Sequence, residues 1–333
     1  MSAEETDPVR LTAARSSAET IASIPQTSLS SGLDPQAVEI VEPVTGSDIP
    51  VRLLYVETWD GLYAPVGLRL PEGPGPFPTV VMASGNGGGG MAWIRDAVAN
   101  RGYTMERLLQ AGYACAWIRY RSEVELGYHS GGQLVWDQRQ GGDMFNRAPL
   151  EYEDEIAILE YLKGRPEVDG DRMAHIGSSH GGEMALKITS EYHGLAAAVA
   201  NEPAAHEFLA LTPDETAPMN EETGLRNIEN MQMAEVEKVR SRIDTDLASK
   251  RIAGITTPIL VIGRETDHLQ GIFRTTYELL EEAGKDVEWV SFDHPVHGFV
   301  FPFRGKDGSY EVDSVQDGAI ETILDFLGRR LGA

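Results

Sequence analysis

The sequence predicts an α/β fold, namely a mostly parallel, doubly wound sheet with helices on both faces. Continuous apolar runs support this prediction, because strands covered on both faces of a parallel sheet read as unbroken apolar segments. Helical patterns lie between the runs, and repeated alternation of strand and helix builds such a sheet. The runs cover residues 79–83, 114–118, 173–176, 195–200, 259–262 and 287–292.

The helical patterns between and after these runs have recognisable ends. Apolar side chains recur at every third or fourth position over residues 150–163, until Gly164 and Pro166 end the helix. A second helix is expected over about residues 181–192. The C-terminal helix carries an apolar stripe that runs to Leu331, and Asp313 or Ser314 is expected to cap its first turn.

The remaining segments divide the chain into an N-terminal arm and one larger domain. Residues 1–37 are expected to form a helical arm, opened by Asp7 and Pro8. Residues 38–333 are expected to form the catalytic domain, whose first part, 38–70, reads as antiparallel strands. Residues 203–253 carry no strand pattern, and 225–243 read as a charged amphipathic helix. We therefore expect a small helical cap insertion over the edge of the sheet.

Composition and charge exclude several classes of protein. The net charge of −24 comes from 28 basic and 52 acidic residues, and it repels nucleic-acid backbones and anionic lipid. We therefore expect no nucleic-acid partner and no membrane partner. The first ten residues are acidic, and no apolar stretch of signal-peptide or transmembrane length follows them, so cytoplasmic residence is expected.

The metal-binding and redox residue types are sparse. Cys115 is the single cysteine, which excludes an intrachain disulfide and a cysteine-based metal site. The 8 histidines show no His-Glu-x-x-His or comparable ligand spacing. We expect no metal ion and no cofactor.

Ser179 is the candidate nucleophile. It lies in the sequence GSSHG, with Gly177 two residues before it and Gly181 two residues after it. A buried strand precedes this segment and a helical pattern follows it, which is the context of a G-x-S-x-G elbow. Such an elbow holds a serine on a tight turn, and its neighbours must be small for the backbone to fold so closely.

A serine hydroxyl needs a base to take its proton, and that base needs a carboxylate to hold its tautomer. Asp267 follows the apolar run 259–262, and His297 follows the run 287–292. The ends of parallel strands are where such sites assemble, and the order serine, acid, histidine is the one this fold requires. We therefore predict Ser179, Asp267 and His297 as a catalytic triad.

Other residues compete for two of these roles. Glu265 or Asp293 is an alternative carboxylate, and His294 is an alternative base. His294 directly follows a strand and has less loop with which to reach across the site. Asp267 and His297 are preferred because the nucleophile, the base and the acid that orients it must meet within hydrogen-bond reach.

The chemistry also needs N–H donors for the oxyanion that develops on the substrate. The backbone N–H of His180, directly after the nucleophile, is the first expected donor. The glycine-rich loop after residues 79–83 is expected to supply the second, from Asn86 or from Gly87. The loop has no Gly-Lys-Ser/Thr ending, so a phosphate-binding P-loop is not supported.

With these residues placed, the chain resembles the dienelactone hydrolase-like and prolyl-oligopeptidase-like branch of the α/β hydrolases, over about residues 51–331. The resemblance lies in the segments PFPTVVMASGNGGGG, RPEVDGDRMAHIGSSHGGEMAL, TPILVIGRETD and HGF. Two features depart from these relatives: Ser84 stands where many have histidine in the oxyanion loop, and the elbow carries serine where dienelactone hydrolases carry cysteine. The residues before Val38 are too few for a propeller domain, which favours an esterase over a peptidase.

The expected function is hydrolysis of a carboxylic ester of a small or medium-sized molecule through an acyl-enzyme on Ser179. A peptidase or amidase, a C–C bond hydrolase and a noncatalytic binding protein are the alternatives. Loops after strand ends often shape substrate pockets, so we name four candidate substrate contacts. They are Arg121, Tyr128, Trp136 and Glu202. The natural substrate stays open, and a homo-oligomer is compatible with the sequence.

Overall fold

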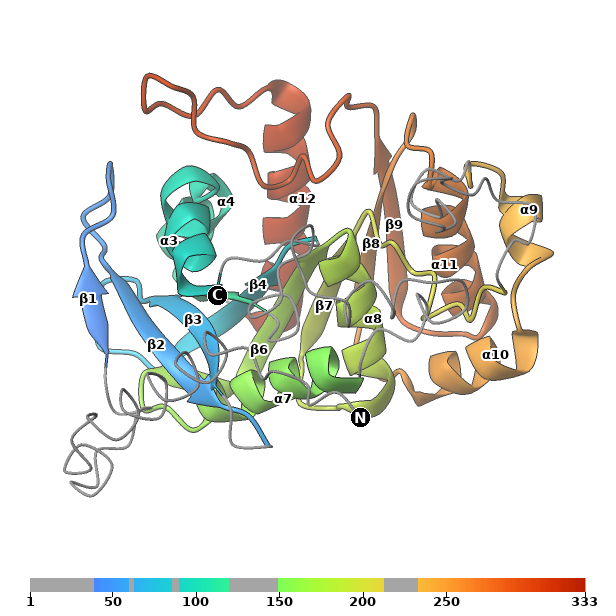
Figure 1. Ribbon diagram of the computed structural model, residues 1–333, viewed down its shortest axis with the longest axis horizontal. Coiled ribbons are helices and arrows are strands. Elements are labelled where there is room, and N and C mark those ends of the chain that lie inside the picture. The colour runs from blue at the N-terminus through green and yellow to red at the C-terminus, as the bar shows by residue number, and fades with distance from the viewer. Residues whose placement is uncertain (1–38, 60–62, 86–89, 120–148, 213–232, 333) are drawn as a thin grey trace, which may run out of the picture. The chain divides into compact units, whose positions relative to one another are not determined.

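Figure 1 shows the computed structural model of the chain, which describes residues 39–59, 63–85, 90–119, 149–212 and 233–332. The chain divides into two compact units, Met1–Glu39 and Ile40–Ala333, and the second unit is described below. The helical arm expected over residues 1–37 lies outside the described residues. Of the helices in the described ranges, none has both the length and the apolar character that crossing a bilayer requires.

A nine-stranded sheet in the order β1-β2-β3-β5-β4-β6-β7-β8-β9 organises the described residues. The first three strands and the β3–β5 pair are antiparallel, whereas every pair from β5 to β9 is parallel. This arrangement confirms the predicted mostly parallel α/β sheet with an antiparallel start. The strands are β1 Ile40–Glu42, β2 Val51–Glu57, β3 Tyr63–Arg69, β4 Phe77–Ala83, β5 Ala114–Ile118, β6 Val168–Ser178, β7 Ala197–Asn201, β8 Ile259–Arg264 and β9 Val287–Phe292.

Helices cover both faces of this sheet (Figure 1). Successive strand residues point to opposite faces, so Met82 of β4 packs with α3, α4 and α12, whereas Val81 packs with α7 and α8. Helix α11 covers the second face further along, over β7 and β8. The helices are α3 Gly90–Asn100, α4 Tyr103–Gln110, α7 Pro149–Lys163, α8 His180–Glu191, α9 Val236–Arg240, α10 Thr245–Gly254, α11 Gln270–Glu282 and α12 Ser314–Leu331.

The predicted elements agree closely with the observed ones. The runs at 114–118 and 287–292 have the bounds of β5 and β9, and the run at 173–176 lies in the buried second half of the longer strand β6. Asp313 caps α12: its Oδ1 accepts hydrogen bonds from the N–H groups of Val315 and Gln316, at 2.8 and 2.9 Å. In return, Oε1 of Gln316 accepts the backbone N–H of Asp313 at 3.1 Å, so the start of the helix is fixed from both sides.

The helix expected over 225–243 is confirmed only in part over its described residues. Only α9 is helical there, and the chain from Met233 to Glu235 is not. The N–H of Met233 donates to the carbonyl oxygen of His268 at 2.7 Å, and this stretch packs closely against Gly271. This tertiary contact outweighs the local helical pattern. Residues 213–232 lie outside the described residues, so the cap insertion stays a prediction.

The parallel strands bring four loops to one edge of the sheet. Strands β6, β7, β8 and β9 are parallel neighbours and end at Ser178, Asn201, Arg264 and Phe292. Residues that follow these ends therefore lie on the same edge, where ligand sites of parallel sheets form.

Candidate active site

Ser179 occupies a strained turn between β6 and α8. Its φ of 57° and ψ of −118° are rare for a residue with a side chain. A Cβ atom on Gly177 would lie 1.9 Å from the carbonyl oxygen of Gly181, and one on Gly181 would lie 2.6 Å from that of Ala83. A side chain at either position would clash with the backbone, so both positions need glycine. The N–H of Ser179 donates to the carbonyl oxygen of Asn201 at 3.0 Å, which fixes the turn to β7.

Gly85, which follows β4, lies directly against this serine. A Cβ atom on Gly85 would lie 3.4 Å from Oγ of Ser179 and 3.2 Å from its Cβ. The buried Arg119, which sequence reasoning did not single out, donates from Nη1 to the carbonyl oxygen of Gly85 at 2.9 Å. Its guanidinium carbon lies 4.2 Å from the centre of the Trp93 ring. Gly85 is therefore held next to the nucleophile by a buried arginine.

The two expected donors from this loop, Asn86 and Gly87, lie outside the described residues. The same holds for Arg121, Tyr128 and Trp136, the expected substrate contacts in the segment after β5.

His297 and Asp267 are brought together by the ends of β9 and β8. Nδ1 of His297 lies 2.8 Å from Oδ2 of Asp267, and 35% of the histidine side chain is exposed. Asp267 is buried, and its Oδ1 accepts the N–H of Leu269 at 2.8 Å. Burial alone would raise the pKa of Asp267, but the hydrogen bonds from His297 and Leu269 hold that pKa well below its usual range.

Glu202 is a second carboxylate at this histidine. It follows β7, is fully buried, and has a φ of 46°. Its Oε1 lies 3.4 Å from Nδ1 of His297, and its Oε2 accepts the N–H of Gly298 at 2.7 Å. Burial alone would lower the pKa of His297, but the hydrogen bonds to Asp267 and Glu202 raise it to about 9. The structure thus corrects the expectation that Glu202 contacts substrate, because its side chain is enclosed on the Nδ1 side of His297.

Arg264, the last residue of β8, joins the two carboxylates. Its Nε lies 3.0 Å from Oε1 of Glu202, and its Nη2 lies 2.5 Å from Oδ2 of Asp267. Glu202, Asp267 and His297 also offer ligand atoms within 4.8 Å of one another, the spacing of a metal site. A guanidinium already supplies the positive charge between the carboxylates, so we assign no metal ion to this cluster.

The rival residues lie outside this cluster. Glu265 and Asp293 are exposed. His294 is buried, but its Nε2 lies 3.0 Å from Oδ2 of Asp313 and its ring stacks on Phe299 at 5.0 Å. Among the residues weighed from the sequence, Asp267 and His297 are the pair that the fold brings into contact.

The side chain of His180 is turned into the protein. Its Nε2 lies 2.7 Å from Oε2 of Glu151 on α7, and both side chains are buried. One turn further along α7, Glu155 makes the same kind of contact with His175 of β6 at 2.8 Å. These two contacts join α7 to β6 and to the start of α8, the two elements on either side of Ser179.

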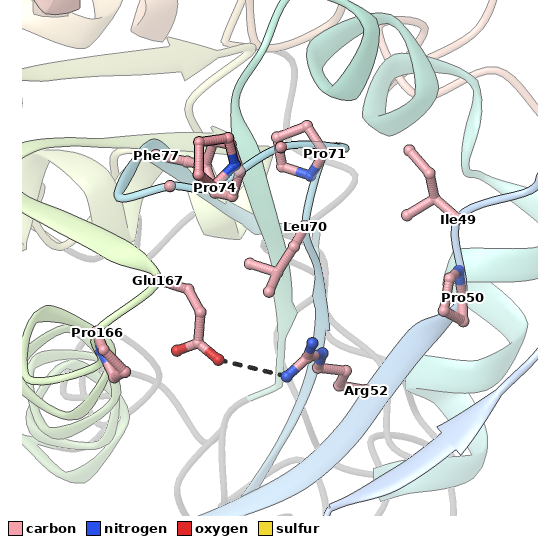
Figure 2. Close-up of a pocket in the computed structure, with 11 residues that line it drawn as sticks. Ile49, Pro50, Arg52, Leu70, Pro71, Pro74, Phe77, Pro166 and Glu167 are labelled. Atoms are coloured by element: carbon pink, nitrogen blue, oxygen red, sulfur yellow. Dashed lines mark hydrogen bonds and ion pairs between the residues drawn. The ribbon is translucent and has the colours of Figure 1, made fainter.

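A pocket of about 450 Å³ lies elsewhere on the sheet (Figure 2). Glu167 and Arg52 point toward each other in it, 3.3 Å apart. Phe77, which begins β4, also lines it, so the pocket lies at the edge opposite to Ser179. Its lining residues are Ile49, Pro50, Arg52, Leu70, Pro71, Gly73, Pro74, Gly75, Phe77, Pro166 and Glu167.

Comparison with known proteins identifies the fold. A family model described as alpha/beta hydrolase fold matches residues 145–301, a span that contains Ser179, Asp267 and His297. The chain has the α/β-hydrolase fold. This confirms the fold that the resemblance in the sequence implied.

Two solved structures share this α/β-hydrolase fold. Acylaminoacyl peptidase from Pyrococcus horikoshii aligns with a TM-score of 0.57 and 16% identity, over 86% of this chain and 42% of that one. A putative dienelactone hydrolase from Klebsiella pneumoniae aligns with a TM-score of 0.53 and 15% identity, over 85% of this chain and 100% of that one.

A curated relative of this α/β-hydrolase-fold chain is the human mitochondrial acyl-coenzyme A thioesterase 2. The two sequences are 29% identical over 180 residues, which is 50% of this chain. The match spans only 32% of the thioesterase.

Proposed function

We propose that the protein is a serine hydrolase that cleaves a carboxylic ester of a small or medium-sized molecule through an acyl-enzyme on Ser179. The observation that carries this proposal is the 2.8 Å contact between His297 and Asp267, at the sheet edge that also presents the strained Ser179. An oriented imidazole and a partly exposed serine at one edge are the minimum that acyl transfer needs.

In this mechanism His297 takes the proton of Ser179 through Nε2, since Nδ1 is engaged by Asp267. The serine oxygen attacks the ester carbonyl, and the backbone N–H of His180 together with an N–H of Asn86 or Gly87 holds the oxyanion. The negative charge of Asp267 stabilises the imidazolium. The alcohol leaves with the proton from His297, and water then releases the acyl group by the same route.

A thioester is a second candidate substrate. The similarity to acyl-coenzyme A thioesterase 2 favours it, because thioesters and esters react through the same tetrahedral intermediate. The net charge of −24 opposes a polyanionic carrier such as coenzyme A, which favours a neutral ester.

The test is turnover of a p-nitrophenyl ester, a thioester and a p-nitroanilide that share one short acyl chain. Ser179→Ala should lower kcat for the preferred substrate by on the order of 10⁶-fold, as for other serine nucleophiles. Ser190→Ala, which removes a hydroxyl from the same helix α8, is the matched control and should keep full activity. Equal turnover by purified wild-type protein and Ser179→Ala would refute the assignment.

A fluorophosphonate probe separates an enzyme from a noncatalytic protein of the same fold. The probe reacts only with an activated serine, so it should label Ser179 in the wild-type protein and not in the alanine variant. Failure to label the wild-type protein would favour a binding protein.

A further inference from the structure

Glu202 is a buried carboxylate that a serine, histidine and aspartate do not require. An ionised side chain without exposed surface is costly unless it is paired and hydrogen-bonded. Both oxygens of Glu202 are engaged: Oε1 by Arg264 at 3.0 Å, and Oε2 by the N–H of Gly298 at 2.7 Å and by Nδ2 of Asn201 at 2.9 Å. Its φ of 46° adds backbone strain at the same residue. Strain and full engagement at one buried acid indicate a positioning role.

The contacts of Glu202 connect the nucleophile turn with the histidine loop. Nδ2 of Asn201 donates to Oγ of Ser178, the residue before the nucleophile, at 2.9 Å. The same amide nitrogen donates to Glu202, which in turn accepts the N–H of Gly298. A continuous chain of hydrogen bonds thus runs from the residue before Ser179 to the residue after His297.

The charges around His297 balance only when its ring is protonated. In the described part of the chain, the charged groups at Nδ1 are the carboxylates of Asp267 and Glu202, with Arg264 between them. His268 lies 3.1 Å from the far oxygen of Asp267. Arg264 also donates to the carbonyl oxygen of His294 at 3.0 Å. The two carboxylates and the one guanidinium carry a net charge of −1, which a protonated His297 ring neutralises.

We propose that Glu202 is a positioning residue of the site, which shares with Asp267 the task of orienting His297 and stabilising its protonated form. Through Gly298 it also fixes the histidine loop relative to the Ser179 turn. This inference rests on the proposed function, in which the imidazolium forms as the serine is deprotonated. The raised pKa of His297 agrees with two carboxylates rather than one acting on the ring.

Glu202→Gln keeps the size of the side chain and removes its charge. NMR titration of the His297 ring should show its pKa fall by about one pH unit or more, because an opposite charge at this range shifts a pKa by about that amount. The acidic limb of the plot of kcat/KM against pH should move to lower pH by the same amount. Glu265→Gln removes an exposed carboxylate from the same edge and is the matched control, which should leave both midpoints in place. An unchanged His297 midpoint in folded Glu202→Gln would overturn the proposal.

A second measurement needs no variant, in case Glu202→Gln does not fold. In the wild-type protein the carboxyl carbon resonance of Glu202 should move at the same pH midpoint as the His297 ring. A carboxyl resonance that stays constant through that midpoint would overturn the proposal. Both titrations are independent of substrate, so absence of ester hydrolysis would refute the proposed function without deciding the role of Glu202.

Discussion

Nδ1 of His297 lies 2.8 Å from Oδ2 of Asp267, although 30 residues separate them in the sequence. The contact follows from the register of β8 and β9, which pairs Arg264 with Phe292 at the last position of both strands. The aspartate and the histidine stand only a few residues beyond that pair, in adjacent loops of one sheet edge. The pairing of β8 with β9 therefore brings the two side chains within hydrogen-bond distance.

Replacement of Asp267 tests the use of this contact. Asp267→Asn should lower kcat by on the order of 10³-fold, somewhat less than the roughly 10⁴-fold loss that a wrong histidine tautomer causes. The smaller loss is expected because Glu202 still faces Nδ1 at 3.4 Å. Asp293→Asn, at an exposed acid near β9, is the control and should keep activity. A larger loss in Asp293→Asn than in Asp267→Asn would reverse the assignment of the acid.

The elbow depends on the absence of a side chain at Gly177. Gly177→Ala would place a methyl group 1.9 Å from the carbonyl oxygen of Gly181, where only backbone could move aside. We expect the free energy of unfolding to fall by about 3 kcal/mol, at the upper end for overpacking. Gly318→Ala meets nothing within 4 Å inside α12, so it should be neutral or stabilise the protein by about 0.5–1 kcal/mol. Urea unfolding of both variants measures the contrast, and equal midpoints would contradict it.

Gly85→Ala should affect activity more than stability. Its methyl group would lie 3.4 Å from Oγ of Ser179, and we expect it to obstruct the approach of an ester carbonyl carbon to that oxygen. Because a displacement of about 1 Å at a reacting centre can cost about 10²-fold, we expect a loss of that size in kcat/KM. The midpoint temperature of thermal unfolding should change little. Full activity in Gly85→Ala would mean that substrate approaches the serine from another side.

The core of this site was predictable because each of its residues follows a strand that the sequence predicts. Continuous apolar runs identified β6, β8 and β9, and the residues after those runs included Ser179, Asp267 and His297. The choice between neighbouring candidates rested on loop reach alone. The structure places Asp267 and His297 in contact and leaves Glu265 and Asp293 exposed.

The rest of the site depends on tertiary contacts that no local pattern records. Glu202 follows a strand as Asp267 does, so the same rule pointed to it, but its role depends on a positive φ and on Arg264 from another strand. Arg119 contacts Gly85 only because β5 and β4 are neighbours, although they are separated in the sequence by two helices. The helix expected over 225–243 was interrupted by a contact with His268 for the same reason.

Cys115 should be chemically silent in the folded protein. The side chain is fully buried, and burial raises the pKa of its thiol far above the usual range. A thiol reagent should therefore modify no cysteine in the native protein and one cysteine per chain after denaturation. Ester hydrolysis should survive the native treatment. Native modification with loss of activity would show that the interior around β5 opens.

The pH dependence of activity and that of stability should have opposite signs. The pKa of His297 is raised to about 9 from an ordinary value of 6.5, and only the neutral ring can accept the serine proton. Roughly 1% of the ring is neutral at pH 7, so kcat/KM should rise about tenfold per pH unit and level off above pH 9. A raised pKa in the folded state stabilises the protein fully below pH 6.5 and loses that contribution as the pH rises through about 9. The midpoint temperature of thermal unfolding should therefore fall over the pH interval in which activity rises. In His297→Gln, the share of this decrease that comes from the histidine should be absent. A kcat/KM plateau already reached near pH 6.5 would show that the two carboxylates do not hold the proton on the ring.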